Sequence, residues 1–159
     1  MTRSLRPSAW QPDGVRIQIA MRLLLVTPER QLLDTEIEEV YAPGVLGQFG
    51  VLPEHVNFLT ALGTGELRHR TAGVDHYVAV SGGILEVLDD VVTVLADSAE
   101  SADEIDVGRA TLAAERLRHA LGRTASDAPE VVDLQSALVR AANRQAVGAR
   151  AGRQSVAAR

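Results

Sequence analysis

The chain has 159 residues, a hydrophobic fraction of 46% and a formal net charge of −5. This length suits one modest domain with an appendage, and the hydrophobic content excludes a wholly disordered polymer. The negative charge argues against nucleic acid as the main partner, and the lack of cysteine excludes disulfides, thiolate zinc sites and thiol nucleophiles.

The first twenty residues differ in texture from those that follow. They are rich in arginine, proline and other polar residues, and they lack the apolar run of a secretory signal. No later segment reaches the roughly 18 consecutive apolar residues that a membrane-spanning helix needs. We expect residues 1–20 to form a disordered extension. Met21, directly before the first strand-like run, is a second candidate start of translation.

Residues 21–100 have the pattern of an antiparallel β-sandwich. Short aliphatic runs separated by turn signals occur at residues 23–26, 76–80, 84–88 and 91–96. The last run is rich in β-branched residues and apolar on both faces of the expected strand. This pattern predicts a central strand that is covered on both sides. Eight of the 13 glycines lie between Gly44 and Gly83, as in a fold with many short strands and close turns.

One strand-like segment changes phase. Leu33, Thr35 and Ile37 alternate with charged or polar neighbours, and the alternation slips before Val40. Such a slip predicts a β-bulge.

Residues 101–148 follow the helical period instead. Asp103 or Asp106 can cap the first helix, and residues 122–129 form a polar break. Two apolar stripes flank this break: Val107, Ala110, Ala114, Leu117 and Leu121, then Val131, Leu134, Leu138 and Ala141. They predict an antiparallel hairpin of two helices of about 15 residues each. The fold class is therefore α+β, with a sandwich at 21–100, a helical hairpin at 101–148 and a basic flexible tail at 149–159.

The hairpin is rich in alanine, which buries less apolar surface than leucine or valine. Gly108 in the first turn costs roughly 1 kcal/mol relative to alanine. We therefore expect a hairpin that is weakly held and able to open.

Several arginines of the hairpin share faces. Arg116 lies two turns beyond Arg109 on the first helix, and Arg140 and Arg144 are one turn apart on the second. Guanidiniums concentrated in this way favour an anion, and phosphate matches their fork geometry. The alternative is a helix cap and a surface ion pair between Asp106 and Arg109, which contributes a few tenths of a kcal/mol.

No catalytic constellation or metal site accompanies these arginines. The glycine-rich stretch 44–50 lacks the Lys-Ser/Thr pair of a phosphate-binding P-loop. The acids before the first helix have no partner histidine, and the four histidines are scattered over different elements.

Three motifs together carry a family resemblance. They are Gly-x-x-Gly-x-Phe-Gly-Val-Leu-Pro-x-His at 44–55, Ser-Gly-Gly-Ile-Leu-Glu-Val at 81–87 with Val-Thr-Val-Leu-Ala-Asp at 92–97, and Ile-Asp-x-x-Arg-Ala at 105–110. In this order, from about Arg22 to Arg150, the chain resembles the epsilon subunit of the bacterial F-type ATP synthase, the counterpart of the mitochondrial delta subunit.

The resemblance implies a rotor subunit without chemistry of its own. In the family, the sandwich docks on the gamma subunit and on the c-ring of the proton-translocating enzyme, and it turns with the central stalk. The hairpin can extend toward the catalytic alpha and beta subunits and inhibit ATP hydrolysis. Such a protein is peripheral at the cytoplasmic face of the bacterial inner membrane, which it touches only through the c-ring.

The resemblance also assigns two sets of residues. The family requires no cofactor, but several members bind ATP as a regulatory ligand on the folded hairpin. The matching ATP-binding positions are Glu100, Ile105, Asp106, Arg109, Ala110, Arg116, Arg140 and Arg144. The expected contact loop for gamma and the c-ring comprises Gly47, Gln48, Phe49, Gly50, Pro53 and His55. Relatives often carry an acid where Gln48 stands. Within the ATP site we expect apolar contact with adenine near Ile105 and Ala110, and Glu100 or backbone groups at its amino edge.

Two other functional classes remain as alternatives. A free-standing ATP sensor would have the same binding residues but no stalk partners. A small nucleotide hydrolase would need a carboxylate cluster for a metal, or a positioned base near the arginines.

Overall fold

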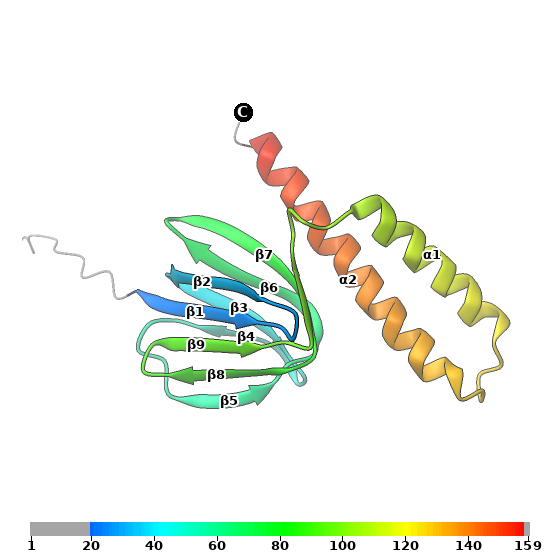
Figure 1. Cartoon of the computed structure of the whole chain (residues 1–159), viewed down its shortest axis with the longest axis horizontal. Coiled ribbons are helices and arrows are strands. Elements are labelled where there is room, and N and C mark those ends of the chain that lie inside the picture. Colours follow the sequence, from blue (N-terminus) through cyan, green and yellow to red (C-terminus); the bar gives the residue numbers. More distant parts are fainter. Residues whose placement is uncertain (1–19, 158–159) are drawn as a thin grey trace, which may run out of the picture.

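The computed structural model describes the backbone of residues 20–157 and the side chains of residues 20–151. The extension expected at residues 1–20 therefore lies almost wholly outside the described residues. Within this part of the chain ten strands precede two helices, and this order of many short strands before two helices is the predicted one (Figure 1). The strands are β1 Met21–Val26, β2 Gln31–Ile37, β3 Glu39–Gly44, β4 Gly47–Val51, β5 Phe58–Ala61, β6 Thr64–Thr71, β7 Val74–Ser81, β8 Ile84–Leu88, β9 Val91–Leu95 and β10 Ser98–Ser101. The helices are α1 Val107–Arg123 and α2 Glu130–Ala157.

The strands form two five-stranded sheets that pack face to face. Sheet A has the order β2-β1-β9-β8-β5 and sheet B the order β10-β7-β6-β3-β4. Neighbouring strands are antiparallel except β1 and β9, which are parallel. Aliphatic side chains from both sheets fill the space between them, among them Leu23, Leu67 and Val94, each with 0% of its surface exposed. The α+β class and the sandwich are thus confirmed.

Tight turns account for the many short strands. Ala72 and Gly73 join β6 to β7, and Asp89 and Asp90 join β8 to β9, all four with positive φ. Two consecutive residues of this kind make the turn whose twist matches that of paired strands. Gly83 has a further reason to lack a side chain, because a Cβ there would lie 2.0 Å from the carbonyl oxygen of Leu95.

The predicted bulge before Val40 is wrong. The chain instead leaves sheet A after Ile37 and enters sheet B at Glu39, with Glu38 between the strands. The inward face of β2 and that of β3 belong to different sheets, so the alternation restarts. A slip in phase has the same sequence signature whether a strand bulges or changes sheet.

The prediction for residues 91–96 is half right. β9 is the central strand of sheet A, but only one of its faces is buried. Val92 and Val94 are fully buried in the core, whereas Val91 and Leu95 are 39% and 47% exposed. On this outer side Leu88 lies opposite Val91, and Ile84 lies opposite Leu95. We call the outer surface formed by Leu59, Ile84, Leu88, Val91 and Leu95 the open face.

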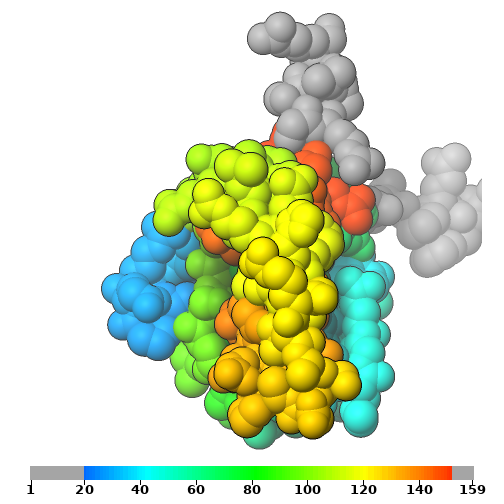
Figure 2. Space-filling view, turned by 90° about the vertical axis from the view of Figure 1, so that its right-hand side faces the viewer, coloured from blue at the N-terminus to red at the C-terminus, as the bar shows by residue number. Residues whose placement is uncertain are grey.

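The helical hairpin is attached through one helix only. α2 packs on β6 and β7 of sheet B, and α1 packs on α2 (Figure 1). Seen from the hairpin side, α1 is outermost and strands of the sandwich are visible on both flanks (Figure 2). The hairpin therefore belongs to sheet B and leaves the open face of sheet A uncovered. Within the described residues, neither helix is long and apolar enough to cross a membrane.

The second helix is longer than the sequence suggested, with 28 residues against the expected 15 or so. The flexible tail predicted at 149–159 is instead helical as far as Ala157, and Gly148 directly before it is buried. Val147 is fully buried in a small cluster with Ala79, Ala102 and Ile105. Contacts with the sandwich, which the local sequence does not reveal, thus stabilise this half of the helix.

Gly148 lies at a close approach between α2 and the segment that leads into α1. A Cβ on Gly148 would lie 2.8 Å from Cγ2 of both Ile105 and Val107. A glycine here lets the helix approach the linker at a distance that no other residue permits.

The alanine variant at this position should therefore open the hairpin. A Gly148→Ala substitution should destabilise the folded hairpin by about 1–3 kcal/mol through overpacking. Hydrogen exchange should become faster in α1 and α2 and stay unchanged in β1 and β9. Gly122→Ala is the matched control, because a Cβ on Gly122 meets nothing within 4 Å. Equal protection of the helices in both variants would contradict this account.

A buried histidine makes the sandwich sensitive to acid. His69 on β6 is 4% exposed and stacks on His76 of β7 with 5.1 Å between ring centroids. Burial, reinforced by the charge that His76 can carry and opposed by Asp75, lowers the pKa of His69 from 6.5 to about 4. The folded protein therefore holds this imidazole neutral where an unfolded chain would protonate it.

The sign of the pH effect follows. Because the folded pKa lies below the unfolded one, the stability contributed by neutral His69 is complete above pH 6.5 and is lost as the pH falls toward 4. The slope should approach roughly 1.4 kcal/mol per pH unit within this window. Urea unfolding between pH 7 and 4.5 measures it, and His69→Leu should flatten the slope. Replacing the exposed His119 should leave the slope unchanged; an equal slope in the His69 variant would refute the assignment.

Candidate functional site

A cavity of about 410 Å³ lies where the hairpin meets sheet B. Residues of β6, β7 and β10 form its floor, and residues of both helices form its other side. The lining residues are Thr64, Ala79, Val80, Ser81, Ser98, Ala99, Glu100, Ala113, Leu117, Ala137, Arg140, Ala141, Asn143 and Arg144. This volume falls in the range of small-molecule sites, and the walls combine apolar surface with a few polar groups.

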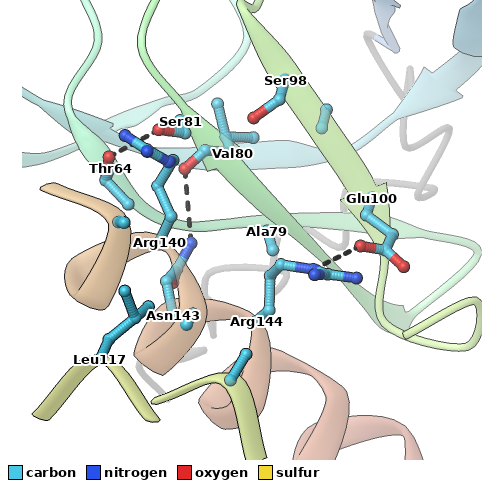
Figure 3. A pocket seen from close by; sticks show the side chains of 14 residues that line it. Thr64, Ala79, Val80, Ser81, Ser98, Glu100, Leu117, Arg140, Asn143 and Arg144 are labelled. Atoms are coloured by element: carbon cyan, nitrogen blue, oxygen red, sulfur yellow. Dashed lines mark hydrogen bonds and ion pairs between the residues drawn. The ribbon is translucent and has the colours of Figure 1, made fainter. Parts of the chain in front are cut away.

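Two guanidiniums reach into the cavity from consecutive turns of α2 (Figure 3). Arg144 donates from Nε to Oε2 of Glu100 on β10 at 2.7 Å. Arg140 points toward the hydroxyl pair of Thr64 and Ser81, whose oxygens are 2.7 Å apart. Glu100 is the only acid among the described lining residues, so two cations and one anion give the cavity a net positive charge.

Asn143 fastens the helix beside these arginines. Its Nδ2 donates to the backbone oxygens of Gly65, at 2.9 Å, and Val80, at 3.4 Å. Because these carbonyls belong to β6 and β7, the amide fixes the position of α2 on sheet B. The positions of Arg140 and Arg144 over the cavity follow from this contact.

Two further ion pairs hold the hairpin from outside the cavity. Arg150 donates from Nε to Oε2 of Glu66 at 3.0 Å and lies 5.3 Å from the ring centroid of Tyr77. Arg30 in the β1–β2 turn pairs with Glu104, just before α1, with 3.1 Å between Nη1 and Oε1. The hydrogen bond from Arg30 lowers the pKa of Glu104 below its usual value.

The structure brings three of the eight predicted ATP-binding residues into the cavity lining. These are Glu100, Arg140 and Arg144. Arg109 and Arg116 are exposed on α1 and do not line the cavity, but each is one helical turn from Ala113, which does. Both arginines therefore stand near its rim.

The other three predicted residues build the hairpin itself. Asp106 is the N-cap of α1, and its carboxylate accepts from the backbone N–H of Arg109 at 2.9 Å. Ile105 is 7% exposed and packs with Val147. Ala110 is 1% exposed on the face of α1 that meets α2. Asp106 is thus a helix cap, as the alternative interpretation predicts. Within the described residues, its carboxylate forms no ion pair with the Arg109 side chain.

The sequence interpretation missed the hydroxyl groups and Asn143. Thr64, Ser81 and Ser98 come from three strands that only the sheet order places together. Asn143 left a usable signal, because it is a polar residue between two arginines that face the cavity.

The second predicted region, the loop around β4, divides into two parts. Gly47 and Gln48 are exposed at the tip of the β3–β4 hairpin. The sequence interpretation overlooked two apolar residues at the same tip, Val45 and Leu46, which are 61% and 101% exposed. The predicted contact residues Phe49, Gly50, Pro53 and His55 are partly buried.

The partly buried residues of this region pack on other aromatic rings. The ring of Phe58 lies 5.6 Å from that of Phe49 and 5.1 Å from that of His55. A Cβ on Gly50 would approach the ring of Tyr41 to 2.8 Å. Of the predicted contact residues, Gly47 and Gln48 at the tip are therefore the exposed ones.

Comparisons with known proteins agree on one family. The family described as "ATP synthase, Delta/Epsilon chain, beta-sandwich domain" matches residues 20–102. An ATP synthase epsilon chain of Geotalea uraniireducens is 43% identical over 134 residues, which cover 84% of this chain and 97% of that one. An epsilon chain of Syntrophobacter fumaroxidans is 48% identical over 124 residues, covering 78% and 92% of the two chains.

The fold has a solved counterpart. A chain in the Euglena gracilis mitochondrial ATP synthase, solved as OSCP/F1/c-ring, superposes with a TM-score of 0.71 at 23% identity, covering 90% of this chain and 89% of that chain. This likeness extends over both the sandwich and the helices. The family match and the sequence relatives lead to one conclusion: the chain belongs to the ATP synthase delta/epsilon family, the family of the epsilon subunit of the F-type enzyme.

Proposed function

We propose that the protein is a non-catalytic central-stalk subunit of a proton-translocating F-type ATP synthase, which couples gamma to the c-ring and inhibits ATP hydrolysis through an ATP-sensitive hairpin. One observation carries the regulatory part. The positively charged cavity is bounded by the sandwich, α1 and α2 together, so a ligand inside it would contact all three. In this assignment the protein is peripheral at the cytoplasmic face of the bacterial inner membrane, through the c-ring.

ATP suits the cavity by charge and shape. Its phosphates would meet Arg140 and Arg144, with Arg109 and Arg116 near the rim and the hydroxyls of Thr64, Ser81 and Ser98 on the floor. Its base would lie against the apolar wall from Ala113, Leu117, Ala137 and Ala141. Guanidiniums bind phosphate without hydrolysing it, and the one acid of the lining is engaged by Arg144.

A bound ligand would favour the folded hairpin by mass action. At a hundred times its dissociation constant, a ligand that binds only the folded form stabilises that form by about 2.7 kcal/mol. This is comparable with one buried Leu or Val side chain. Because α1 is held mainly by α2, and by small residues such as Ala110 and Ala114, a change of this size can decide between closed and open states.

The open face of sheet A is the proposed docking surface for gamma. It presents Leu59, Ile84, Leu88, Val91 and Leu95, each at least 39% exposed, around the exposed Glu86. Strands that are apolar on both faces belong in a sheet covered on both sides, and among the described residues a helix covers sheet B only. A partner with an apolar surface and a cation opposite Glu86 would complete the cover.

The β3–β4 tip is the proposed contact with the c-ring. Leu46 projects fully into solvent between Val45 and Gly47, and Gln48 stands where relatives often have an acid. Apolar contact and amide hydrogen bonds would therefore replace a charge contact at this tip.

The ATP proposal is tested by calorimetry. The protein should bind ATP, and Arg140→Gln with Arg144→Gln should weaken binding at least tenfold, because two charge-assisted contacts are lost. Arg118→Gln, an exposed arginine of α1 outside the cavity lining, should leave the affinity unchanged. The double variant should also inhibit ATP hydrolysis by the assembled enzyme less than the unaltered chain. If millimolar ATP gives no heat of binding, the proposal that the hairpin senses ATP is refuted. If the double variant inhibits ATP hydrolysis as strongly as the unaltered chain, these arginines have no role in the inhibition.

The docking proposal is tested by co-purification. A tagged chain should retain gamma and c subunits from detergent-solubilised membranes, and Leu88→Asp should lose them by placing a charge in the apolar contact. Leu112→Asp is the matched control, because Leu112 on α1 is 55% exposed and Leu88 is 50% exposed. Retention of gamma by the Leu88 variant would show that another surface docks. Loss in both variants would point to misfolding, which hydrogen exchange of β9 would reveal.

A further inference from the structure

The ion pair between Glu100 and Arg144 spans the cavity wall where a phosphate would bind. It joins β10 to α2 with 2.7 Å between Nε and Oε2, and both side chains are partly buried, 28% and 37% exposed. Arg144 can grip a phosphate by its Nε edge only if that edge is free. In the structure the Nε of this edge donates to Glu100, so a carboxylate charge stands beside it.

The two arginines of the cavity therefore differ. Arg140 has no ion pair within the described residues, and it points toward neutral hydroxyls. Arg144 is neutralised by its partner on β10. A polyphosphate entering the cavity meets one guanidinium without an ion pair and one whose charge is offset by a carboxylate. Bidentate binding at the Nε edge of Arg144 would have to displace that carboxylate.

We propose that Glu100 lowers the affinity of this cavity for polyphosphate ligands by holding Arg144, and thereby sets the ligand concentration at which the hairpin responds. This inference rests on the proposed ATP-binding function and adds an internal competitor to it. Glu100 acts here as a positioning residue that opposes the ligand, rather than as a group that reads adenine.

The same pair also contributes to holding the hairpin on the sandwich. Without a ligand, Glu100 and Arg144 connect the sandwich to α2 across the cavity. When a phosphate takes Arg144, the ligand supplies that connection and the carboxylate is released. This exchange costs the ligand part of its binding free energy.

A second pair on the same helix provides a control. Arg150 and Glu66 also join α2 to sheet B, with 3.0 Å between Nε and Oε2, yet neither residue lines the cavity. Glu66→Gln removes one negative charge and one latch, as Glu100→Gln does, without freeing an arginine inside the cavity. The two variants therefore separate local competition from net charge and from hairpin stability.

The experiment measures ATP and tripolyphosphate binding by calorimetry for the unaltered full-length chain, Glu100→Gln and Glu66→Gln. Releasing a partly exposed pair should tighten binding of both ligands about three- to tenfold in Glu100→Gln and leave Glu66→Gln unchanged. Hydrogen exchange of α2 in the absence of ligand confirms that each variant keeps its hairpin. Binding by Glu100→Gln alone would also support the inference.

Other results overturn it in distinguishable ways. Weaker or unchanged ATP binding by Glu100→Gln, with the unaltered chain still binding, would refute the competition and leave the ATP site in place. Equal tightening in both variants would assign the effect to net charge. Failure of all three proteins to bind either ligand would remove the proposed ATP function, and the inference with it.

Discussion

The attachment of a single helix to sheet B determines everything the hairpin can do. α2 contacts β6 and β7, whereas α1 is held mainly by α2. The seam between α2 and the sandwich combines the fully buried Val147, the close approach at Gly148 and the amide contacts of Asn143. Because the cavity lies on this seam, a ligand bound there and the resting position of both helices share one set of contacts. A ligand bound there should therefore also favour hairpin closure.

The outer surfaces of the two sheets differ. Sheet B is covered outside by the chain's own helix, while the outer surface of sheet A presents aliphatic side chains to solvent. The sequence of β9 does not show which face is buried, because the exposed Val91 and Leu95 are as apolar as the buried Val92 and Val94. A strand of this composition fits a sheet that is enclosed only within an assembly. The family to which the chain belongs supplies the reason for the open face, and the structure supplies its residues.

Local pattern predicted much of this fold, and long-range contact accounts for the rest. The strand-like runs, the turns at Ala72–Gly73 and Asp89–Asp90 and the paired helices all follow from periodicity and turn chemistry. The change of sheet at Glu38 does not, because crossing between sheets and bulging disturb alternation in the same way. The length of α2 was not predicted either, because the linker at Ile105 and the sandwich stabilise the helix around Val147 and Gly148. At the site, spacing identified the arginines of α2, but only sheet order could bring Thr64, Ser81 and Ser98 beneath them. The 105–110 motif combined two roles that sequence cannot separate, because a cap and a ligand both need the carboxylate of Asp106.

The balance of the seam indicates which contacts resist opening and which tune it. Opening would return Glu66, Glu100, Arg144 and Arg150 to water, where each charge regains hydration, so these partly exposed pairs add only modest resistance. Exposing Val147 has no such compensation, and full burial of a valine contributes about 1.5–3 kcal/mol. The apolar contacts should therefore stabilise the closed state more than the ion pairs do. The charged groups respond to what enters the cavity, because an anion can replace Glu100 at Arg144 while no solute replaces the packing of Val147. A ligand-dependent arm needs this division, since an arm held by charges alone would respond to salt rather than to a specific ligand.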